Sequence, residues 1–136
     1  MVANSKLAVA LHVMTALAYS DGRLLTSEQL ADSIHTNPVV VRRIISELAR
    51  AGLVESRRGK AGGARLARPA SSITLFDIYR AIDGMGPFCL PKPGSESCIV
   101  ANCMPDIVSD VIGDIDNAIE DTLRHRTVAD LVTRVR

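Results

Sequence analysis

Apolar residues in the first part of the chain recur at the three- and four-residue spacing of amphipathic helices. A first helix is predicted over residues 6–19, with an apolar stripe made of Leu7, Leu11, Met14 and Ala18. Thr26 and Gln29 fit a capping box, so a second helix should start there. Asn37 supplies a capping side chain and Pro38 a backbone preset for a first helical turn, which predicts a third helix from Pro38. The apolar positions of this third helix, which should face the core, are Val41, Ile44, Ile45 and Leu48.

The pattern changes after Gly52, a residue well suited to end the third helix. Residues 53–57 and 64–68 are predicted to form two strands, joined by a flexible turn from Gly59 to Gly63. Two short helices joined by a tight turn are typical of a helix-turn-helix, whose second helix enters the major groove of DNA. With the hairpin as a wing, the fold class is mainly α with a small β-hairpin wing, a winged helix-turn-helix.

The second half of the chain predicts a helix, a long loop and a further long helix. Thr74 and Asp77 fit another capping box, and Gly84 and Gly86 should end the helix that starts there. The stretch from Gly84 to Pro105 is rich in proline and holds all three cysteines, which favours a loop. We therefore expect a winged helix-turn-helix DNA-binding domain over residues 1–84, a cysteine-containing loop over 85–105, and a dimerisation helix with a C-terminal helix over 106–136.

An apolar stripe follows Pro105 over several helical turns, while acidic residues occupy the other faces. The stripe consists of Val108, Val111, Ile112, Ile115, Ile119 and Leu123. It has to be covered, either by folding back on the chain's own domain or by a second copy of the chain. The a/d-like spacing favours paired helices, so we expect these residues to form the interface of a homodimer. Thr127 and Asp130 should cap a last short helix.

The net charge of +1 conceals an uneven distribution. Residues 1–70 carry ten basic and five acidic residues, whereas residues 71–136 carry six and ten. Between Arg42 and Arg68 eight basic residues face only two acidic ones, which favours the phosphate backbone of double-stranded DNA as a partner. The residues expected to contact DNA are Lys6, Thr36, Asn37, Pro38, Val39, Arg42, Arg43, Arg57, Arg58, Lys60 and Arg65.

Other classes of protein find little support in the sequence. No apolar run is long enough to span a bilayer and the chain starts without a secretory signal, so we expect a cytoplasmic protein without a membrane partner. A nucleophile elbow, an HExxH motif and a phosphate-binding loop are all lacking, so we expect no enzyme. A winged helix used as a protein-interaction module, without sequence-specific DNA binding, is the alternative function.

An ordered set of motifs over nearly the whole chain resembles one known family. The motifs are Lys6-Leu7-Ala8-Val9-Ala10-Leu11, Ala51-Gly52-Leu53-Val54, Arg58-Gly59-Lys60-Ala61-Gly62-Gly63 and Ile73-Thr74-Leu75-Phe76-Asp77-Ile78, followed by the cysteine-containing loop and the long helix. They resemble the Rrf-two family of bacterial winged-helix transcription regulators, typified by IscR, NsrR and CymR. Residues 4–10 and 36–43 are most similar to its YwnA-like branch, which generally lacks a metal centre. The resemblance implies a dimeric transcription factor, often a repressor, that reads a palindromic operator.

One departure from the family concerns base readout. Many members carry Tyr-Leu-Glu-Gln where this chain has Val40-Val41-Arg42-Arg43. Arg42 or Arg43 could form a bidentate contact to guanine, or either could bind phosphate or lie on a solvated helix face. We expect Arg42→Ala to weaken operator binding by about 1–3 kcal/mol and to relax specificity at one base pair.

The three cysteines leave several functions open. Cys89, Cys98 and Cys103 lie where cluster-binding relatives hold an iron-sulfur centre, but the spacing C-x8-C-x4-C differs from the more even spacing of those relatives. Ala8 stands where some relatives use an acidic ligand, so His12 or His35 would have to supply a fourth ligand. An iron-sulfur cluster, a thiol switch and inert thiols without a cofactor all remain possible, and the chain shows no paired CxxC of a structural zinc site.

Overall fold

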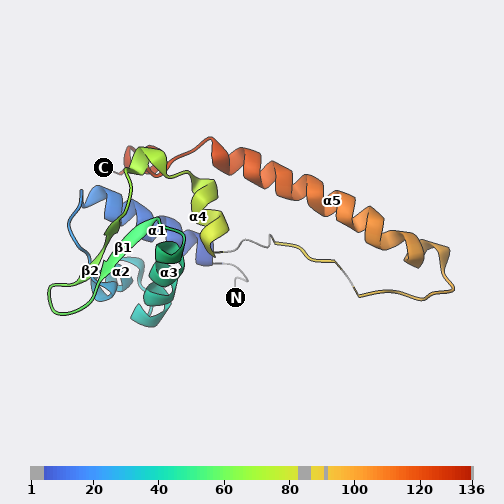
Figure 1. Cartoon of the computed structure of the whole chain (residues 1–136), viewed down its shortest axis with the longest axis horizontal. Coiled ribbons are helices and arrows are strands. Elements are labelled where there is room, and N and C mark those ends of the chain that lie inside the picture. The colour runs from blue at the N-terminus through green and yellow to red at the C-terminus, as the bar shows by residue number, and fades with distance from the viewer. Residues whose placement is uncertain (1–4, 83–86, 91, 136) are drawn as a thin grey trace.

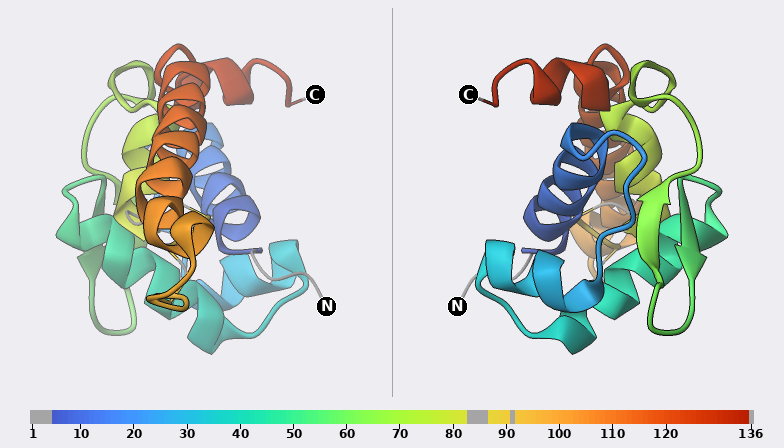
Figure 2. Two further views of the ribbon diagram at one scale, coloured as in Figure 1. Left: turned by 90° about the vertical axis from the view of Figure 1, so that its right-hand side faces the viewer. Right: turned by 90° about the vertical axis from the view of Figure 1, so that its left-hand side faces the viewer.

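A computed structural model of the 136-residue chain describes residues 5–82, 87–90 and 92–135. A compact head carries the hairpin, and a long helix projects from it (Figure 1). In Figure 2 the hairpin and α2 lie on opposite sides of the head, with α6 across its top. The elements are α1 (Lys6–Tyr19), α2 (Ser27–Ile34), α3 (Pro38–Arg50), β1 (Val54–Arg57), β2 (Gly63–Leu66), the 3-10 turn η1 (Ala70–Ser72), α4 (Leu75–Ile82), α5 (Ile99–Arg124) and α6 (Val128–Val132).

Side-chain caps define the starts of α2, α3, α4 and α6, as the sequence predicted. Thr26 Oγ1 accepts a hydrogen bond from the Gln29 amide at 3.0 Å, and the Thr26 amide donates to Gln29 Oε1 at 2.9 Å. Asn37 Oδ1 accepts from the Val39 amide at 2.8 Å, so α3 begins at Pro38. These bonds satisfy amides that would otherwise lack partners at a helix N-terminus. The same reciprocal pairing joins Thr74 with Asp77 and Thr127 with Asp130.

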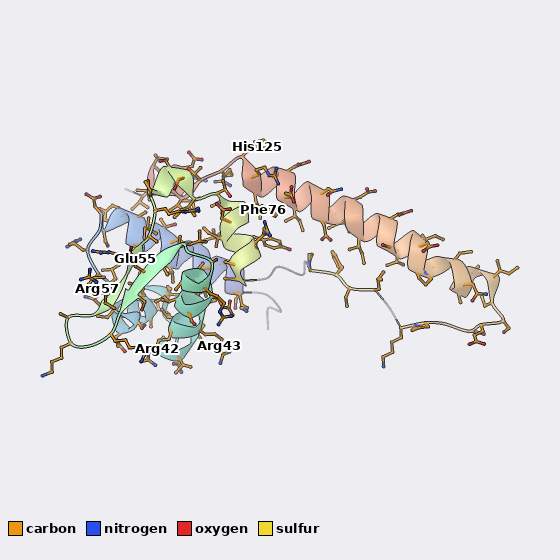
Figure 3. The ribbon with its side chains drawn as sticks, viewed as in Figure 1. Arg42, Arg43, Glu55, Arg57, Phe76 and His125 are labelled. Carbon is orange, nitrogen blue, oxygen red and sulfur yellow. The ribbon has the colours of Figure 1, made fainter. Side chains whose placement is uncertain are left out.

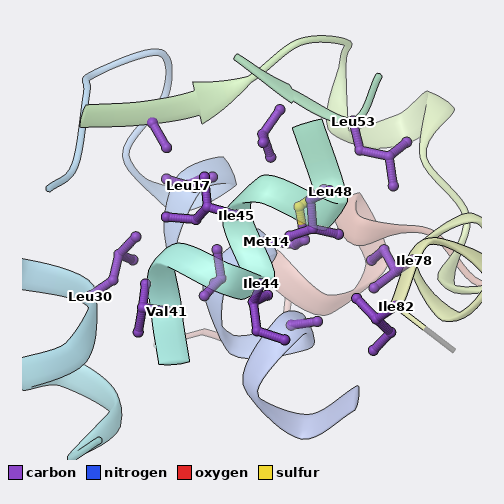
Figure 4. Close-up of a cluster of buried hydrophobic side chains, with 14 of the residues drawn as sticks. Met14, Leu17, Leu30, Val41, Ile44, Ile45, Leu48, Leu53, Ile78 and Ile82 are labelled. Carbon is purple, nitrogen blue, oxygen red and sulfur yellow. The ribbon is translucent and has the colours of Figure 1, made fainter. Parts of the chain in front are cut away.

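The core of the head fixes the inner face of α3. α1 to α4 all contribute side chains to one buried apolar cluster (Figure 4). Met14 of α1, Leu48 of α3 and Ile78 of α4 are each 0% exposed. Burying one large aliphatic side chain contributes roughly 1.5–3 kcal/mol, so α3 is held firmly by its inner face while its outer face stays free.

The wing is a two-stranded antiparallel hairpin whose register pairs Val54 with Leu66 and Arg57 with Gly63. Its turn requires glycine at position 62, because a Cβ atom there would lie 2.1 Å from the backbone oxygen of Arg57. Ala64 of β2 also exchanges two backbone hydrogen bonds with Leu25, at 2.8 and 3.0 Å. These bonds anchor the wing beside the loop that leads into α2.

The prediction that the loop continues to Pro105 is wrong, because α5 begins at Ile99. The Asn102 amide donates to the Cys98 carbonyl at 3.1 Å, and Asn102 Nδ2 donates to the Glu96 carbonyl at 3.0 Å, which together hold the first turn. Residues 99–104 contain neither glycine nor proline, and α5 continues through Pro105 although a proline in a helix interior removes one backbone hydrogen bond and crowds the preceding turn. Cys103 therefore lies on a helix. Gly84 and Gly86, expected to end α4, lie outside the described residues.

Among the described residues, the long helix α5 meets the head through its C-terminal part. Leu123 packs against the core cluster, and the Arg124 guanidinium lies 5.7 Å from the centroid of the Phe76 ring. No described residue of α5 is buried, and its far end extends away from the head (Figure 1). The alternative in which this helix folds back as core of its own domain is therefore not what the chain adopts. Within the described residues, none of the helices combines the length and apolar character that crossing a membrane requires.

Candidate nucleic-acid interface

An open cleft of about 580 Å³ lies between the start of α2, the outer face of α3 and the wing. Arg42, Arg43 and Arg57 lie along one edge of the head in Figure 3, whereas Phe76 and His125 mark the joint with α5 at the opposite edge. The acidic helix thus leaves the head away from these arginines. The cleft is lined by Thr26, Ser27, Glu28, Arg42, Ile45, Ser46, Ala49, Ser56, Arg57, Arg58, Gly59, Gly62, Gly63 and Ala64.

The first turn of α3 presents apolar side chains beside a basic one. Val39 is 53% exposed and Val40 38% exposed, although both are aliphatic. Arg43 is exposed on the same helix, one turn further along. Exposed aliphatic groups can contact a thymine methyl group, and arginine can reach guanine or phosphate. Thr36, Asn37 and Pro38 position this turn: Thr36 and Pro38 are half-buried, and Asn37 uses its side-chain oxygen for the cap.

Two of the predicted DNA-binding arginines are held by carboxylates. Arg42 Nη2 lies 3.0 Å from Glu28 Oε2, which joins α3 to the first turn of α2. A hydrogen bond from its own backbone and the Arg42 guanidinium hold the pKa of Glu28 below its ordinary value of 4.5. On the wing, Arg65 Nε lies 3.0 Å from Glu55 Oε2, within the pair of residues that oppose each other across the hairpin.

Four other predicted contacts carry positive charge without a carboxylate partner among the described residues. They lie on the outer face of α3 and around the tip of the wing, and all are exposed: Arg43, Arg57, Arg58 and Lys60. Exposed cations whose charge is not neutralised within the chain attract phosphate most strongly. The cleft thus has the positive charge that binds a nucleic-acid backbone. Its glycine-rich wing also lets that backbone come close.

Lys6 and Arg68 are engaged within the head. Lys6 Nζ lies 3.3 Å from Glu47 Oε1 and 3.3 Å from the carbonyl oxygen of Ile82, so it ties α1 to α3 and α4. The DNA contact expected of Lys6 stays a prediction. Arg68 Nη2 lies 3.4 Å from Asp77 Oδ2, next to a separate hollow at the end of α3.

The three cysteines are exposed and free, and they do not form one cluster: two lie at the start of α5, and the third lies beside the middle of that helix. Cys98 is the N-cap residue of α5 and Cys103 follows in its second turn, whereas Cys89 lines a hollow with Ile112 and Asp116 further along the helix. The described residues contain no group of three histidine, cysteine or acidic side chains able to hold a metal ion. In this conformation the thiols therefore do not fit an iron-sulfur cluster.

The histidines considered as a fourth ligand have structural partners or positions in the head. His12 Nε2 lies 2.9 Å from Ser33 Oγ, which links α1 to α2. His35 adopts the left-handed conformation, with φ of 61°, at the turn between α2 and α3. Neither belongs to a potential metal group within the described part of the chain.

The apolar stripe of α5 meets the head at an apolar groove. A hollow of about 510 Å³ is lined by Leu7 of α1, Tyr79 of α4 and, among others, Ile115, Ile119 and Leu123 of α5. Beyond it, Val108 and Ile112 are half-buried, and Val111 is 54% exposed. The six residues expected at the dimer interface thus share one continuous face, part of which is open.

The sequence analysis assigned no role to Glu28. Its partner Arg42 is 14 residues away, and the pair forms only because the helix-turn-helix brings the two helices together. One sequence signal could have predicted this ion pair. It is a carboxylate in the first turn of α2 together with an arginine on the outer face of α3.

Comparisons with known proteins agree with this geometry. The model of the Rrf2 family, described as "Iron-dependent Transcriptional regulator", matches residues 3–134. The chain is 32% identical over 133 residues to YwnA of Bacillus subtilis (strain 168), a candidate HTH-type transcriptional regulator, covering 97% of this chain and 98% of YwnA.

Solved structures show the same fold. The chain resembles CymR (YrzC), the global cysteine regulator of B. subtilis, with a TM-score of 0.71 and 26% identity over 100% of this chain and 99% of that one. It also resembles a candidate transcriptional regulator from Lactobacillus plantarum, with a TM-score of 0.78 and 25% identity over 93% and 87% of the two chains. These relatives are regulators of transcription and not enzymes. The chain belongs to the Rrf2 family and is a winged-helix DNA-binding regulator of transcription.

Proposed function

We propose that the protein is a homodimeric repressor that binds a palindromic operator in the cytoplasm. The observation that carries the proposal is the basic cleft between α3 and the wing. In each protomer α3 would enter the major groove with the side chains of its first turn, while Arg57, Arg58 and Lys60 would bind the neighbouring backbone. A bound dimer would block access to the DNA it covers.

The dimer is supported by the exposed apolar face of α5. Val111 is 54% exposed and Ile107 50% exposed, and among the described residues the helix meets its own head through the part that follows them. A continuous apolar face of this kind is stabilised when a second copy covers it. Two-fold symmetry would then set two copies of α3 against two half-sites, a requirement of palindromic recognition.

Sedimentation of the full chain tests the dimer. Val111→Glu places a charge on the apolar face at a position that is open in one protomer, so the fold should survive and the dimer should dissociate. Asn117→Glu makes the same addition at an exposed polar position of the same helix and should leave the dimer intact. A Val111→Glu variant that sediments as a wild-type dimer contradicts the proposed interface.

We further propose that thiol chemistry at Cys89, Cys98 and Cys103 regulates DNA binding. All three thiols are exposed, and the segment that carries Cys89 lies along α5 (Figure 1). A chemical change there would move α5 relative to its dimer partner and alter the spacing of the two α3 helices. One solved relative, CymR, is named the global cysteine regulator of B. subtilis, which is consistent with regulation linked to sulfur chemistry.

The thiol proposal is tested by treating the wild type and a variant with all three cysteines replaced by serine with a peroxide. DNA affinity should change in the wild type and stay constant in the variant, and a response in both would contradict the proposal. Protein purified without oxygen should also be colourless and free of iron and sulfide. Bound iron and sulfide would instead indicate an iron-sulfur cluster, assembled in a conformation other than the one described.

A further inference from the structure

One carboxylate stands among the basic and small residues of the DNA-facing cleft. Glu28 is the one acidic residue among those described that line the cleft. Its side chain is 65% exposed and lies in the first turn of α2. In a helix-turn-helix this helix crosses the DNA backbone, so a negative charge here repels phosphate. This charge disfavours binding to phosphate, whatever the DNA sequence, so phosphate binding does not explain why Glu28 lies here.

The partner of Glu28 identifies that role. Arg42 Nη2 donates to Glu28 Oε2 at 3.0 Å, and the Arg42 side chain is still 56% exposed. A guanidinium carries five N–H donors, so one bond to Glu28 leaves others free for a DNA base. A carboxylate and a guanidinium are both ionised at neutral pH, and so the pair is charged before DNA arrives.

Holding Arg42 in advance changes what it can recognise. A long, free arginine can swing between phosphates and bases, and most such contacts carry no sequence information. An arginine held at one edge offers its remaining donors in a fixed direction, which suits the paired O6 and N7 acceptors of guanine. The contrast within α3 is direct, because Arg43 has no carboxylate partner among the described residues.

We propose that Glu28 is a positioning residue that makes Arg42 specific for a guanine-containing base pair in the operator. The inference rests on the proposed function in which α3 enters the major groove. This role predicts a combination of effects on DNA binding that a merely structural residue would not produce. Removing the Glu28 charge should raise affinity for DNA of unrelated sequence and at the same time lower discrimination at one base pair.

The experiment starts with the full-length wild type and random double-stranded DNA. Rounds of selection and sequencing define the operator, and competition binding then measures affinity for the operator, for every substitution in it and for unrelated DNA. The same measurements follow for Glu28→Ala, Arg42→Ala and the double variant. Melting temperatures check that each variant is folded.

Glu55→Gln is the matched control. Glu55 also holds an arginine of the basic surface at 3.0 Å, but this pair lies on the wing rather than at the start of α3. Losing its charge should raise affinity for all sequences alike and leave discrimination unchanged. The comparison separates the removal of one negative charge from the loss of a positioned Arg42.

The expected result is a fall of about tenfold in discrimination, in Glu28→Ala and in Arg42→Ala, at the same base pair in each half-site. The double variant should lose little more than Arg42→Ala alone. The inference is overturned if Glu28→Ala retains wild-type discrimination at every base pair, or if it raises the affinity for all DNA sequences equally. The proposed function stands in either case. If the wild type selects no common sequence, the proposed function itself fails, together with the inference that rests on it.

Discussion

The salt dependence of DNA binding should fall when the tip of the wing loses its charge. Arg58 and Lys60 are exposed and lack carboxylate partners within the described chain, so they are available to phosphate. The perturbation is the double variant Arg58→Ala with Lys60→Ala. Both positions are exposed and flank Gly59 in the turn, so the fold should be unaffected.

The magnitude follows from counting the free cations. Arg43, Arg57, Arg58 and Lys60 give about eight phosphate contacts per dimer, hence a slope of log K against log salt of about −7. The double variant keeps about four contacts and a slope of about −4. Between 50 and 200 mM salt the wild type should therefore lose about 10⁴-fold in affinity, and the variant about 10²-fold.

Fluorescence anisotropy with a labelled operator duplex at several salt concentrations measures both slopes. Arg68→Ala is the control, because Arg68 is bonded to Asp77 and lies outside the cleft, so its slope should match the wild type. Identical slopes for the wild type and the double variant would refute the assignment of the wing to phosphate. A flat response in the wild type would favour a protein-interaction module instead.

Three further outcomes are expected. Lys6→Met should lower the free energy of unfolding, measured in urea, by about 1–3 kcal/mol, because the half-buried Glu47 loses its cationic partner. Loss of DNA affinity with unchanged stability would instead make Lys6 a DNA contact. Gly62→Ala should weaken DNA binding, because its Cβ would collide with the Arg57 carbonyl, and unchanged affinity would show that the wing is dispensable. The pKa of Glu28 is lowered in the folded protein, so its contribution to stability is present above pH 4.5 and is lost as the pH falls below its folded pKa. The melting temperature of Glu28→Gln should therefore fall less steeply with decreasing pH than that of the wild type. Identical pH dependence would show that the pair contributes nothing to stability.

The local elements of the head were predictable because their signals lie close together in the sequence. Thr26 and Gln29, or Asn37 and Pro38, fix a helix start within one turn, and the spacing of the apolar residues of α3 chooses its buried face. Such signals depend on side chains within one or two helical turns of each other, so they can be read without knowing how the helices pack.

Other features depend on contacts between distant parts of the chain and were not predictable. The ion pair of Glu28 with Arg42 requires α2 and α3 to be packed at their final angle. The composition of residues 84–105 predicts a loop up to Pro105, whereas α5 begins at Ile99 and contains Pro105 in its interior. The separation of Cys89 from Cys103 depends on how the preceding segment runs along α5, which spacing in sequence does not reveal.

The central claim, that a dimer reads DNA with two copies of α3, is tested most directly on one operator duplex. Native mass spectrometry gives the number of bound protomers, and hydroxyl-radical footprinting gives the protected positions. We expect a pair of protomers per duplex and two protected segments on one face of the DNA, separated by about one helical turn. One bound protomer, or protection that does not depend on sequence, would contradict the claim.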